Sequence, residues 1–253
     1  MVLHMIGIGL CDERDISVKG LEIVKRCDRI FLESYTSRLC CSKEDMEKLY
    51  GKEIILADRD LVEKNSDEII MPAKDSDVAF LVIGDVFSAT THTDLLLRAH
   101  ENGVEVDIIH NASVLTSIGV TGLELYKFGK TTSVPYPEDG FRPETPYEVL
   151  MDNLSLGYHT LLLLDLKADL NRFMTVSEAV RYLLEIEEKR CEGVFTKETR
   201  CIGCARLGCG DMKVVYGTAS DIAMLDMGGP LHCLIVPGKL HFMEEEAIKR
   251  FDI

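Results

Sequence analysis

Residues 78–93 read VAFLVIGDVFSATTHT, an apolar run that ends at a glycine and is followed by a helical pattern. Six consecutive apolar residues predict a buried strand over residues 78–83. Gly84 allows the backbone to turn sharply or to approach a ligand closely. Open α/β folds bind small ligands at the carboxyl ends of their strands. The stretch therefore predicts a ligand-binding turn that begins with Gly84 and Asp85.

The surrounding pattern alternates strands and helices. Apolar runs predict strands over residues 2–8, 29–33 and 104–110, and a helix over residues 93–101 with Thr91 as its N-cap. A strand, a helix and a strand within about 30 residues are typical of a right-handed βαβ unit. The N-terminal half is therefore predicted to be α/β with a largely parallel sheet.

The middle of the chain changes in composition. Gly119, Gly122 and Gly129 interrupt this stretch, and four prolines fall within residues 135–146, which predicts a domain boundary between residues 113 and 130. We expect an N-terminal α/β domain over residues 1–115, with glycine turns, and a C-terminal α/β domain over residues 116–253. In the second domain the pattern predicts helices over residues 145–156 and 175–190, and strands over residues 160–166, 199–205, 213–216 and 232–236.

Charge and composition exclude several classes of function. The chain has 253 residues, of which 28 are basic and 43 acidic, for a net charge of −15. This balance disfavours nucleic-acid binding, which depends on Lys and Arg neutralising phosphates. No apolar stretch approaches the roughly 18 residues of a membrane span, and no basic leader precedes an apolar run. Nine cysteines at irregular spacings favour free thiols, so we expect a cytoplasmic protein without membrane partners.

Three stretches match known sequence motifs only in part. Gly129-Lys130-Thr131 resembles the end of a phosphate-binding loop, but Glu124 stands where that motif needs its first glycine. The Gly7-x-Gly9 turn lacks the third glycine of a dinucleotide fingerprint. The cysteines at 201, 204 and 209 suggest a metal site, yet strand alternation points the first two to opposite faces. We therefore expect neither phosphoryl transfer nor a bound metal.

Several polar residues stand at predicted strand ends. His110 precedes Asn111-Ala112-Ser113, a turn that should lie beside the Gly84 turn, and His232 begins another strand. His92 and Asp165 are candidates for a general base. Their patterns do not distinguish a catalytic role from a structural one, so the catalytic residues stay unassigned.

Five segments carry a family resemblance: MIGIGL at residues 5–10, GDVFSATTH at 84–92, HNAS at 110–113, LDLK at 164–167 and PGKLH at 237–241. In order over nearly the whole chain, they resemble the tetrapyrrole-methylase-like methyltransferases. ATTH and PGKLH are typical of the branch that acts in diphthamide biosynthesis. The resemblance implies two α/β domains with S-adenosylmethionine in the cleft between them, and a homodimer.

The same resemblance implies a reaction and a set of contacts. The reaction is methylation, up to a trimethylammonium, of the amine on a 3-amino-3-carboxypropyl-histidine of translation elongation factor 2. The implied cofactor contacts are Leu10, Asp85, Ser88, Ser113, Val114, Leu164, Ala205 and His232. One residue departs from the family pattern, because Val86 stands where proline is usual. A proline would fix φ, so we expect a looser turn here.

Three alternatives stay open. A methyltransferase of this family could act on a tetrapyrrole, although few arginines lie near the glycine turns to bind ring carboxylates. A non-catalytic module would bind a ligand without turnover. A cysteine metalloprotein would retain metal when purified without chelator. The number of methyl groups transferred is also left open.

Overall fold

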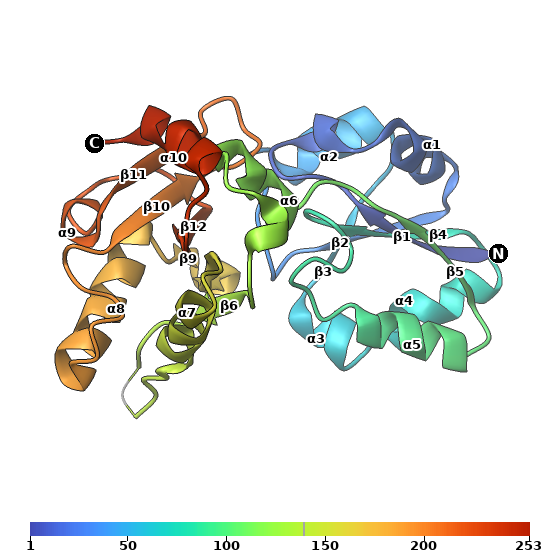
Figure 1. Ribbon diagram of the computed structural model, residues 1–253. Helices are drawn as coiled ribbons and strands as arrows, with labels where there is room; N and C mark the ends of the chain where they lie inside the picture. Colours follow the sequence, from blue (N-terminus) through green and yellow to red (C-terminus); the bar gives the residue numbers. More distant parts are fainter. Residues whose placement is uncertain (139) are drawn as a thin grey trace. The chain divides into compact units, whose positions relative to one another are not determined.

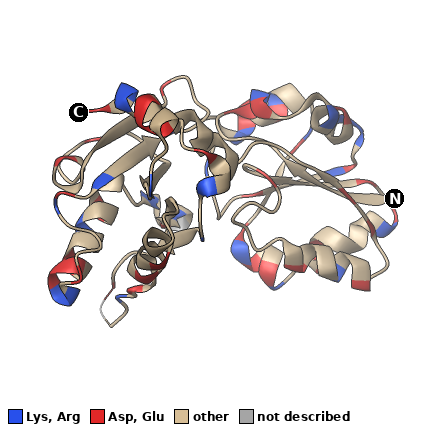
Figure 2. Cartoon of the chain, viewed as in Figure 1, with Lys and Arg blue, Asp and Glu red and all other residues tan. Residues whose placement is uncertain are grey.

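The structure is a computed structural model that describes residues 1–138 and 140–253, without the side chain of residue 169. The chain divides into two compact units, Met1–Ser117 and Ile118–Ile253 (Figure 1). Each unit is an α/β structure with a five-stranded sheet of its own. Acidic and basic residues are interspersed over the helices of both units (Figure 2).

The sheet of the first unit is entirely parallel, as its sequence pattern predicts, and its strand order is β3-β2-β4-β1-β5. The strands are β1 (Val2–Gly7), β2 (Arg29–Glu33), β3 (Ile55–Ala57), β4 (Val78–Val82) and β5 (Glu105–Ile109). In the centre, Met5 of β1 pairs with Phe80 of β4 and with Ile108 of β5. Because all five strands run the same way, their carboxyl ends lie along one edge of the sheet.

Helices cover both faces of this sheet (Figure 1). One face carries α1 (Val18–Arg26) and α2 (Lys43–Tyr50), and the other carries α3 (Arg59–Glu63), α4 (Asp67–Ile70) and α5 (Thr93–Glu101). A last short helix, α6 (Val114–Ser117), follows β5. Apolar side chains fill both interfaces, which explains why β4 has no exposed residue.

Side chains cap two helices of the first unit, and one predicted cap is corrected. Ser17 accepts the backbone N–H of Gly20, and Ser42 forms a capping box with Asp45. The prediction that Thr91 is the N-cap of α5 was wrong. His92 occupies that position, and its side chain makes no capping hydrogen bond. The His92 ring faces Val86 instead, as described below.

The sheet of the second unit is mostly antiparallel, with the order β11-β10-β12-β7-β6 and a parallel β6–β7 pair. Its strands are β6 (Thr132–Val134), β7 (Thr160–Leu164), β10 (Arg200–Ala205), β11 (Lys213–Thr218) and β12 (His232–Val236). Two short strands, β8 (Leu166–Lys167) and β9 (Arg172–Phe173), form a hairpin after β7. The apolar register pairs Leu234 with Leu162 and Gly203.

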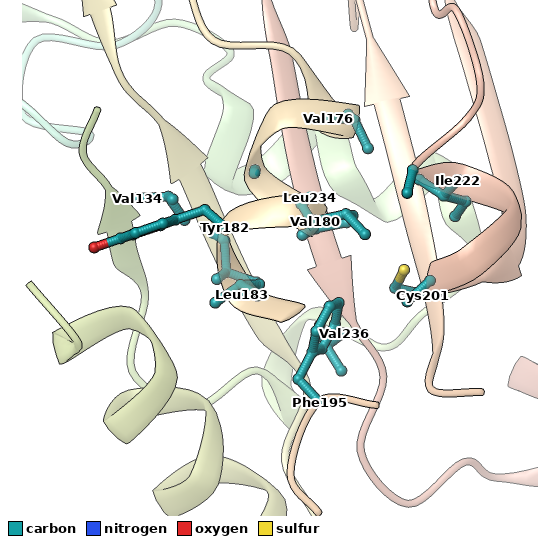
Figure 3. Close-up of a cluster of buried hydrophobic side chains, with 14 of the residues drawn as sticks. Val134, Val176, Val180, Tyr182, Leu183, Phe195, Cys201, Ile222, Leu234 and Val236 are labelled. Carbon is teal, nitrogen blue, oxygen red and sulfur yellow. The ribbon is translucent and has the colours of Figure 1, made fainter. Parts of the chain in front are cut away.

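The described part of the second unit has four α-helices: α7 (Thr145–Ser155), α8 (Val176–Arg190), α9 (Ala219–Ile222) and α10 (Phe242–Ile248). Val180 and Leu183 of α8 pack over Leu234 and Val236 of β12, as Figure 3 shows. Among the described residues, no helix is long and apolar enough to cross a membrane. The short 3₁₀ helices are Glu13–Asp15, Met71–Lys74, Ile118–Thr121, Leu125–Lys127, Ala168–Leu170 and Lys249–Phe251.

Two motifs dismissed at the sequence level have structural explanations. Gly129 leads into β6, and a Cβ there would stand 2.2 Å from Oδ1 of Asn153. That oxygen accepts the backbone N–H of Lys130 at 3.0 Å, so the Gly129-Lys130 segment serves as a packing site for Asn153. Cys201 and Cys204 lie on β10 as buried free thiols.

Candidate functional site

Two glycine turns meet at the carboxyl edge of the first sheet. Gly9 follows β1 and Gly84 follows β4, and their backbones exchange two hydrogen bonds of 2.7 and 3.3 Å. Gly9 has a φ of +82° and Gly84 a φ of +81°, a left-handed conformation that glycine adopts without strain. The predicted ligand-binding turn is therefore joined to the turn after the first strand.

The third turn, after β5, packs against the same point. A Cβ on Gly7 would stand 2.7 Å from the carbonyl oxygen of Gly84 and 3.0 Å from Cβ of Asn111. Asn111 donates through Nδ2 to the carbonyls of Gly7 and Asp15, both at 3.0 Å. The three turns are thus held in van der Waals contact, which requires glycine at position 7.

Asp85 fixes the turn after β4 to the turn after β5. Its Oδ2 accepts from Nδ1 of His110 at 2.8 Å and from the backbone N–H of Asn111 at 3.2 Å. Its Oδ1 accepts from the N–H of Phe87 at 3.1 Å and from Ser88 Oγ at 3.3 Å. Burial raises the pKa of the Asp85 carboxyl, but these donors outweigh it and the pKa is lowered.

Asp15 shapes the loop after β1, a role that sequence reasoning missed. Its Oδ2 accepts from the backbone N–H of Leu10 at 3.1 Å and of Cys11 at 2.7 Å. Asp15 does not cap the following helix α1, whose N-cap is Ser17. Asp15 packs closely on Gly9, since a Cβ on Gly9 would stand 2.4 Å from Cβ of Asp15. This close approach explains why glycine precedes the loop that Asp15 holds.

The predicted contacts of the first unit gather around these turns. A Cβ added to Gly84 would touch Leu10 Cδ2, Ser113 Cα and the Ala112 carbonyl, each at 3.9 Å. Two residues predicted from distant parts of the chain therefore line one small cradle over Gly84. Ser113 begins the turn that leads into α6, where Val114 lies.

The predicted contacts of the second unit lie on three neighbouring strands. Ala205, at the end of β10, is the register partner of His232 at the start of β12. Cys233 pairs with Leu163, which places His232 opposite Leu164 at the end of β7. Leu164, His232 and Ala205 thus form one row across the sheet, although more than 25 residues separate each from the next in sequence.

Both ring nitrogens of His232 are engaged by backbone groups. Nδ1 accepts the N–H of Val176 at 3.3 Å, and Nε2 donates to the carbonyl of Gly229 at 2.9 Å. Burial lowers the pKa of this imidazole, which the Gly229 carbonyl only partly offsets. His232 is therefore a neutral ring that joins β12 to the start of α8.

The two candidate bases lie in structural surroundings. His92 is fully buried and places its ring edge-on to Phe80, with the centroids 5.3 Å apart. Asp165 accepts the backbone N–H of Tyr136 at 2.8 Å through Oδ2. Among the described residues, neither side chain is free of such contacts, so the geometry assigns neither as a general base.

A cavity of about 300 Å³ adjoins the turn after β4. It lies between α3 and α5, and Thr91 of the turn contributes to its wall. Glu63, Asp94 and Arg98 give it mixed charge, and Arg98 is paired with Asp94 at 2.7 Å. Val62 and Leu95 are its apolar lining residues.

Comparison with known proteins identifies the class. Residues 2–223 match the family model of the tetrapyrrole (corrin/porphyrin) methylases. The chain belongs to this family, whose members transfer methyl groups, and it is a methyltransferase that uses S-adenosylmethionine. Within the family, it belongs with the diphthine synthases, as three relatives show.

These relatives match over nearly their whole length. A diphthine synthase of Methanococcus maripaludis is 50% identical over 249 residues, which cover 98% of each protein. A diphthine methyl ester synthase of Aspergillus fumigatus is 47% identical over 268 residues, covering 100% of this chain and 94% of that protein. The crystal structure of a diphthine synthase has a TM-score of 0.91 and 39% identity, covering 100% of this chain and 96% of the other. The predicted α/β fold of the tetrapyrrole methylase type is thereby confirmed.

The turns of the first unit fit the cofactor of this family. The cradle over Gly84, where a Cβ would be in ordinary van der Waals contact, is formed by Leu10, Ala112 and Ser113, which combines an apolar side chain with backbone groups. Small-molecule sites of this kind are largely apolar and hold polar ends through a few backbone groups and hydroxyls. The adenosine and methionine parts of S-adenosylmethionine need both kinds of contact.

Proposed function

We propose that this methyltransferase methylates the amine of a 3-amino-3-carboxypropyl-histidine on translation elongation factor 2, up to the trimethylammonium. The observation that carries the proposal is the cradle over Gly84, which joins the predicted contacts Leu10 and Ser113. Full-length identity of 47 to 50% to proteins named for diphthine chemistry supports the choice of substrate. A tetrapyrrole acceptor is supported only by the match to the tetrapyrrole methylase family model.

The proposed cofactor contacts follow the two units. In the first they are Leu10, Asp85, Ser88, Ser113 and Val114, and in the second Leu164, Ala205 and His232. Asp85 acts mainly by shaping the turn, because four donors already surround its carboxylate. Its negative charge also favours the sulfonium of the cofactor. A cytoplasmic homodimer without a metal belongs to the same proposal.

The chemistry asks little of the side chains beyond position. In each transfer the amine lone pair attacks the methyl carbon, the carbon–sulfur bond breaks, and S-adenosylhomocysteine leaves. The ammonium proton then passes to water before the next transfer. Alignment of nitrogen, methyl and sulfur supplies much of the rate, which suits a site built of rigid turns. No metal and no enzyme nucleophile enters this scheme.

The relatives differ in the product their names describe. One is named a diphthine synthase and the other a diphthine methyl ester synthase. Three transfers to nitrogen complete the trimethylammonium, and a fourth, to a carboxylate oxygen, would form the ester. The proposal commits to the amine, and the number of methyl groups becomes a result of the test.

The test is the intact mass of elongation factor 2 that bears the aminocarboxypropyl-histidine, before and after incubation with this protein and S-adenosylmethionine. Stepwise gains of methyl mass on that histidine are expected. Mild alkaline hydrolysis afterwards removes an ester methyl and leaves N-methyl groups, so it separates three transfers from four. No gain with cofactor binding intact would reject this acceptor, and a tetrapyrrole would be tested next.

A further inference from the structure

The carbonyl oxygen of Val86 is held by two side chains from its own loop. Thr90 Oγ1 donates to it at 2.6 Å, and Nδ1 of His92 lies 3.3 Å from it. Val86 itself is fully buried. The family resemblance that singled out residues 84–92 assigns no role to Thr90 or His92, so these contacts stand apart from the proposed cofactor contacts.

The contact with the Val86 carbonyl determines which ring nitrogen of His92 carries the proton. A carbonyl only accepts hydrogen bonds, so Nδ1 of His92 must be the N–H. Nε2 is then an unprotonated, buried acceptor, and it has no partner among the described residues. Burial lowers the pKa of this imidazole despite the nearby Glu33 carboxylate, so the ring stays neutral. Among the described residues, the ring's hydrogen bond is the one to the Val86 carbonyl.

The backbone between these residues is strained. Ala89 has a φ of +62°, a left-handed conformation that is unfavourable for a residue with a Cβ. Such strain persists only where the surroundings determine the conformation. Here the bonds that span Ala89 run from Thr90 and His92 back to Val86, while Asp85 holds Phe87 and Ser88 on the other side.

Val86 is the second residue of a β-turn, a position that requires a defined backbone φ. The N–H of Ser88 bonds to the carbonyl of Asp85 at 3.3 Å, which makes residues 85–88 a β-turn with Val86 second. Proline is favoured at that position because its ring fixes φ near −65°. Valine lacks the ring, so the conformation must be held by contacts. The sequence predicts a looser turn because Val86 replaces proline. In the structure, the contacts of Thr90 and His92 with the Val86 carbonyl compensate for the missing ring.

We propose that Thr90 and His92 are positioning residues, which hold the Val86 carbonyl and thereby set the Asp85–Ser88 turn for S-adenosylmethionine. The inference rests on the proposed function, since Asp85 and Ser88 are its cofactor contacts. Neither residue needs to touch the cofactor. Their loss should weaken cofactor binding and leave the affinity for elongation factor 2 unchanged.

The experiment measures the dissociation constant for S-adenosylmethionine by calorimetry on the full chain, without the acceptor protein. Thr90→Val removes the hydroxyl and keeps the shape, and Thr90→Ser restores the donor. His92→Phe removes the ring donor, and His92→Asn offers an N–H near the position of Nδ1. We expect Thr90→Val and His92→Phe to weaken binding about five- to tenfold, and Thr90→Ser and His92→Asn to keep most of the parent affinity.

A compensating change separates turn geometry from general loss of stability. In the Thr90→Val background, Val86→Pro should restore cofactor affinity, because the ring fixes the φ that the hydroxyl no longer secures. Thr218→Val is the matched control: it removes the N-cap hydroxyl of α9, lowers stability, and should leave the dissociation constant as in the parent.

Two results would overturn the proposal. One is unchanged cofactor affinity in folded Thr90→Val and His92→Phe variants. The other is a Val86→Pro change that fails to recover affinity although the double variant melts with the parent's cooperativity. If the parent chain does not bind S-adenosylmethionine at all, the proposed function fails first and the positioning role with it. Binding with no methylation of elongation factor 2 removes the substrate assignment alone.

Discussion

At the scale of single residues, the Asp85 carboxylate links two strand ends. His110 and Asn111 at the end of β5 donate to one oxygen, and Phe87 and Ser88 of its own turn donate to the other. A carboxylate can accept at both oxygens, whereas an amide presents one acceptor and one donor. The turn therefore depends on the charge state and on the symmetry of this side chain.

Asp85→Asn should weaken the binding of S-adenosylmethionine by about tenfold or more. Whichever way the amide is oriented, its NH₂ group meets a backbone N–H, of Phe87 or of Asn111, which can only donate, and the turn must rearrange. Calorimetric titration of the full chain with the cofactor checks this. Asp107→Asn is the matched control, because Asp107 also pairs with a histidine, His4, across neighbouring strands of the same sheet. Equal affinities in the two variants would contradict the role given to Asp85.

A second carboxylate, Glu244, is buried in the other unit. Oε1 accepts from Nε2 of His159 and from the N–H of Glu124, both at 2.9 Å. Oε2 accepts from Lys127 and from the N–H of His241, the latter at 2.7 Å. This cluster fastens α10 to the segment before β6 and to the start of β7, and it explains the PGKLH motif, which supplies His241.

Glu244→Gln should lower the free energy of unfolding by about 3 kcal/mol, because it leaves the Lys127 ammonium partly buried without its counter-charge. Urea unfolding followed by circular dichroism checks this. Glu245→Gln, on the exposed side of the same helix, should change stability by no more than about 0.5 kcal/mol. A loss below 1 kcal/mol in Glu244→Gln would show that the cluster is a minor contribution.

At the scale of elements, α8 shows how local sequence and packing agree. Thr175 and Glu178 form a reciprocal capping box, in which Thr175 Oγ1 accepts the N–H of Glu178 at 3.2 Å. The buried residues of the helix recur at helical spacing and pack onto β12 (Figure 3). The predicted helix over residues 175–190 is confirmed for this reason.

Thr175→Ala should destabilise the protein by about 1 kcal/mol, because one N-terminal N–H of α8 loses its acceptor. Thermal unfolding measured by calorimetry checks the change, with Thr175→Ser as the variant that keeps the hydroxyl. Destabilisation of equal size in both variants would mean that the methyl group, rather than the cap, contributes the stability.

Other elements were not predicted, for physical reasons that differ. β6 has only three residues, and its pairing with β7 rather than its own pattern makes it a strand. α3 and α9 have five and four residues, too short for a helical period to show. The predicted strand over residues 160–166 is interrupted at Asp165, whose side chain accepts the N–H of Tyr136.

At the scale of the whole molecule, stability should depend on acid. Burial would raise the pKa of Glu244, but bonds with Lys127, the N–H groups of Glu124 and His241, and His159 outweigh it and lower the pKa to about 2. Burial also lowers the pKa of His159, beyond the opposing effect of Glu244. Because both values are lower than in the unfolded chain, the unfolded state binds protons first as the pH falls.

The free energy of unfolding should therefore be highest at neutral pH and decline below about 6.5 as the unfolded His159 gains its proton. It should fall further between about 4.5 and 2, where Glu244 accounts for roughly 3 kcal/mol. Urea unfolding at a series of pH values checks the profile. Glu244→Gln should flatten the lower part, and an equally steep decline in that variant would assign the acid sensitivity to other groups.

Part of the candidate site could be predicted from the sequence, and part depends on the tertiary structure. Gly84, Asp85 and the carboxyl ends of parallel strands could be predicted, because glycine conformation and strand periodicity are local properties. The row of Leu164, His232 and Ala205 could be placed only through family resemblance, since sheet register joins positions far apart in sequence. The roles of Asp15, Thr90 and His92 depend on which atoms their side chains reach.

The sequence alone determined the two α/β halves, the parallel first sheet, the glycine turns and the methyltransferase class, because period, turn chemistry and motif order are written along the chain. Only the tertiary structure decided that the second sheet is mostly antiparallel and that His92 binds a carbonyl. It also decided that Glu244 is a buried anchor rather than a surface acid. These depend on pairings between distant segments, which no local pattern records.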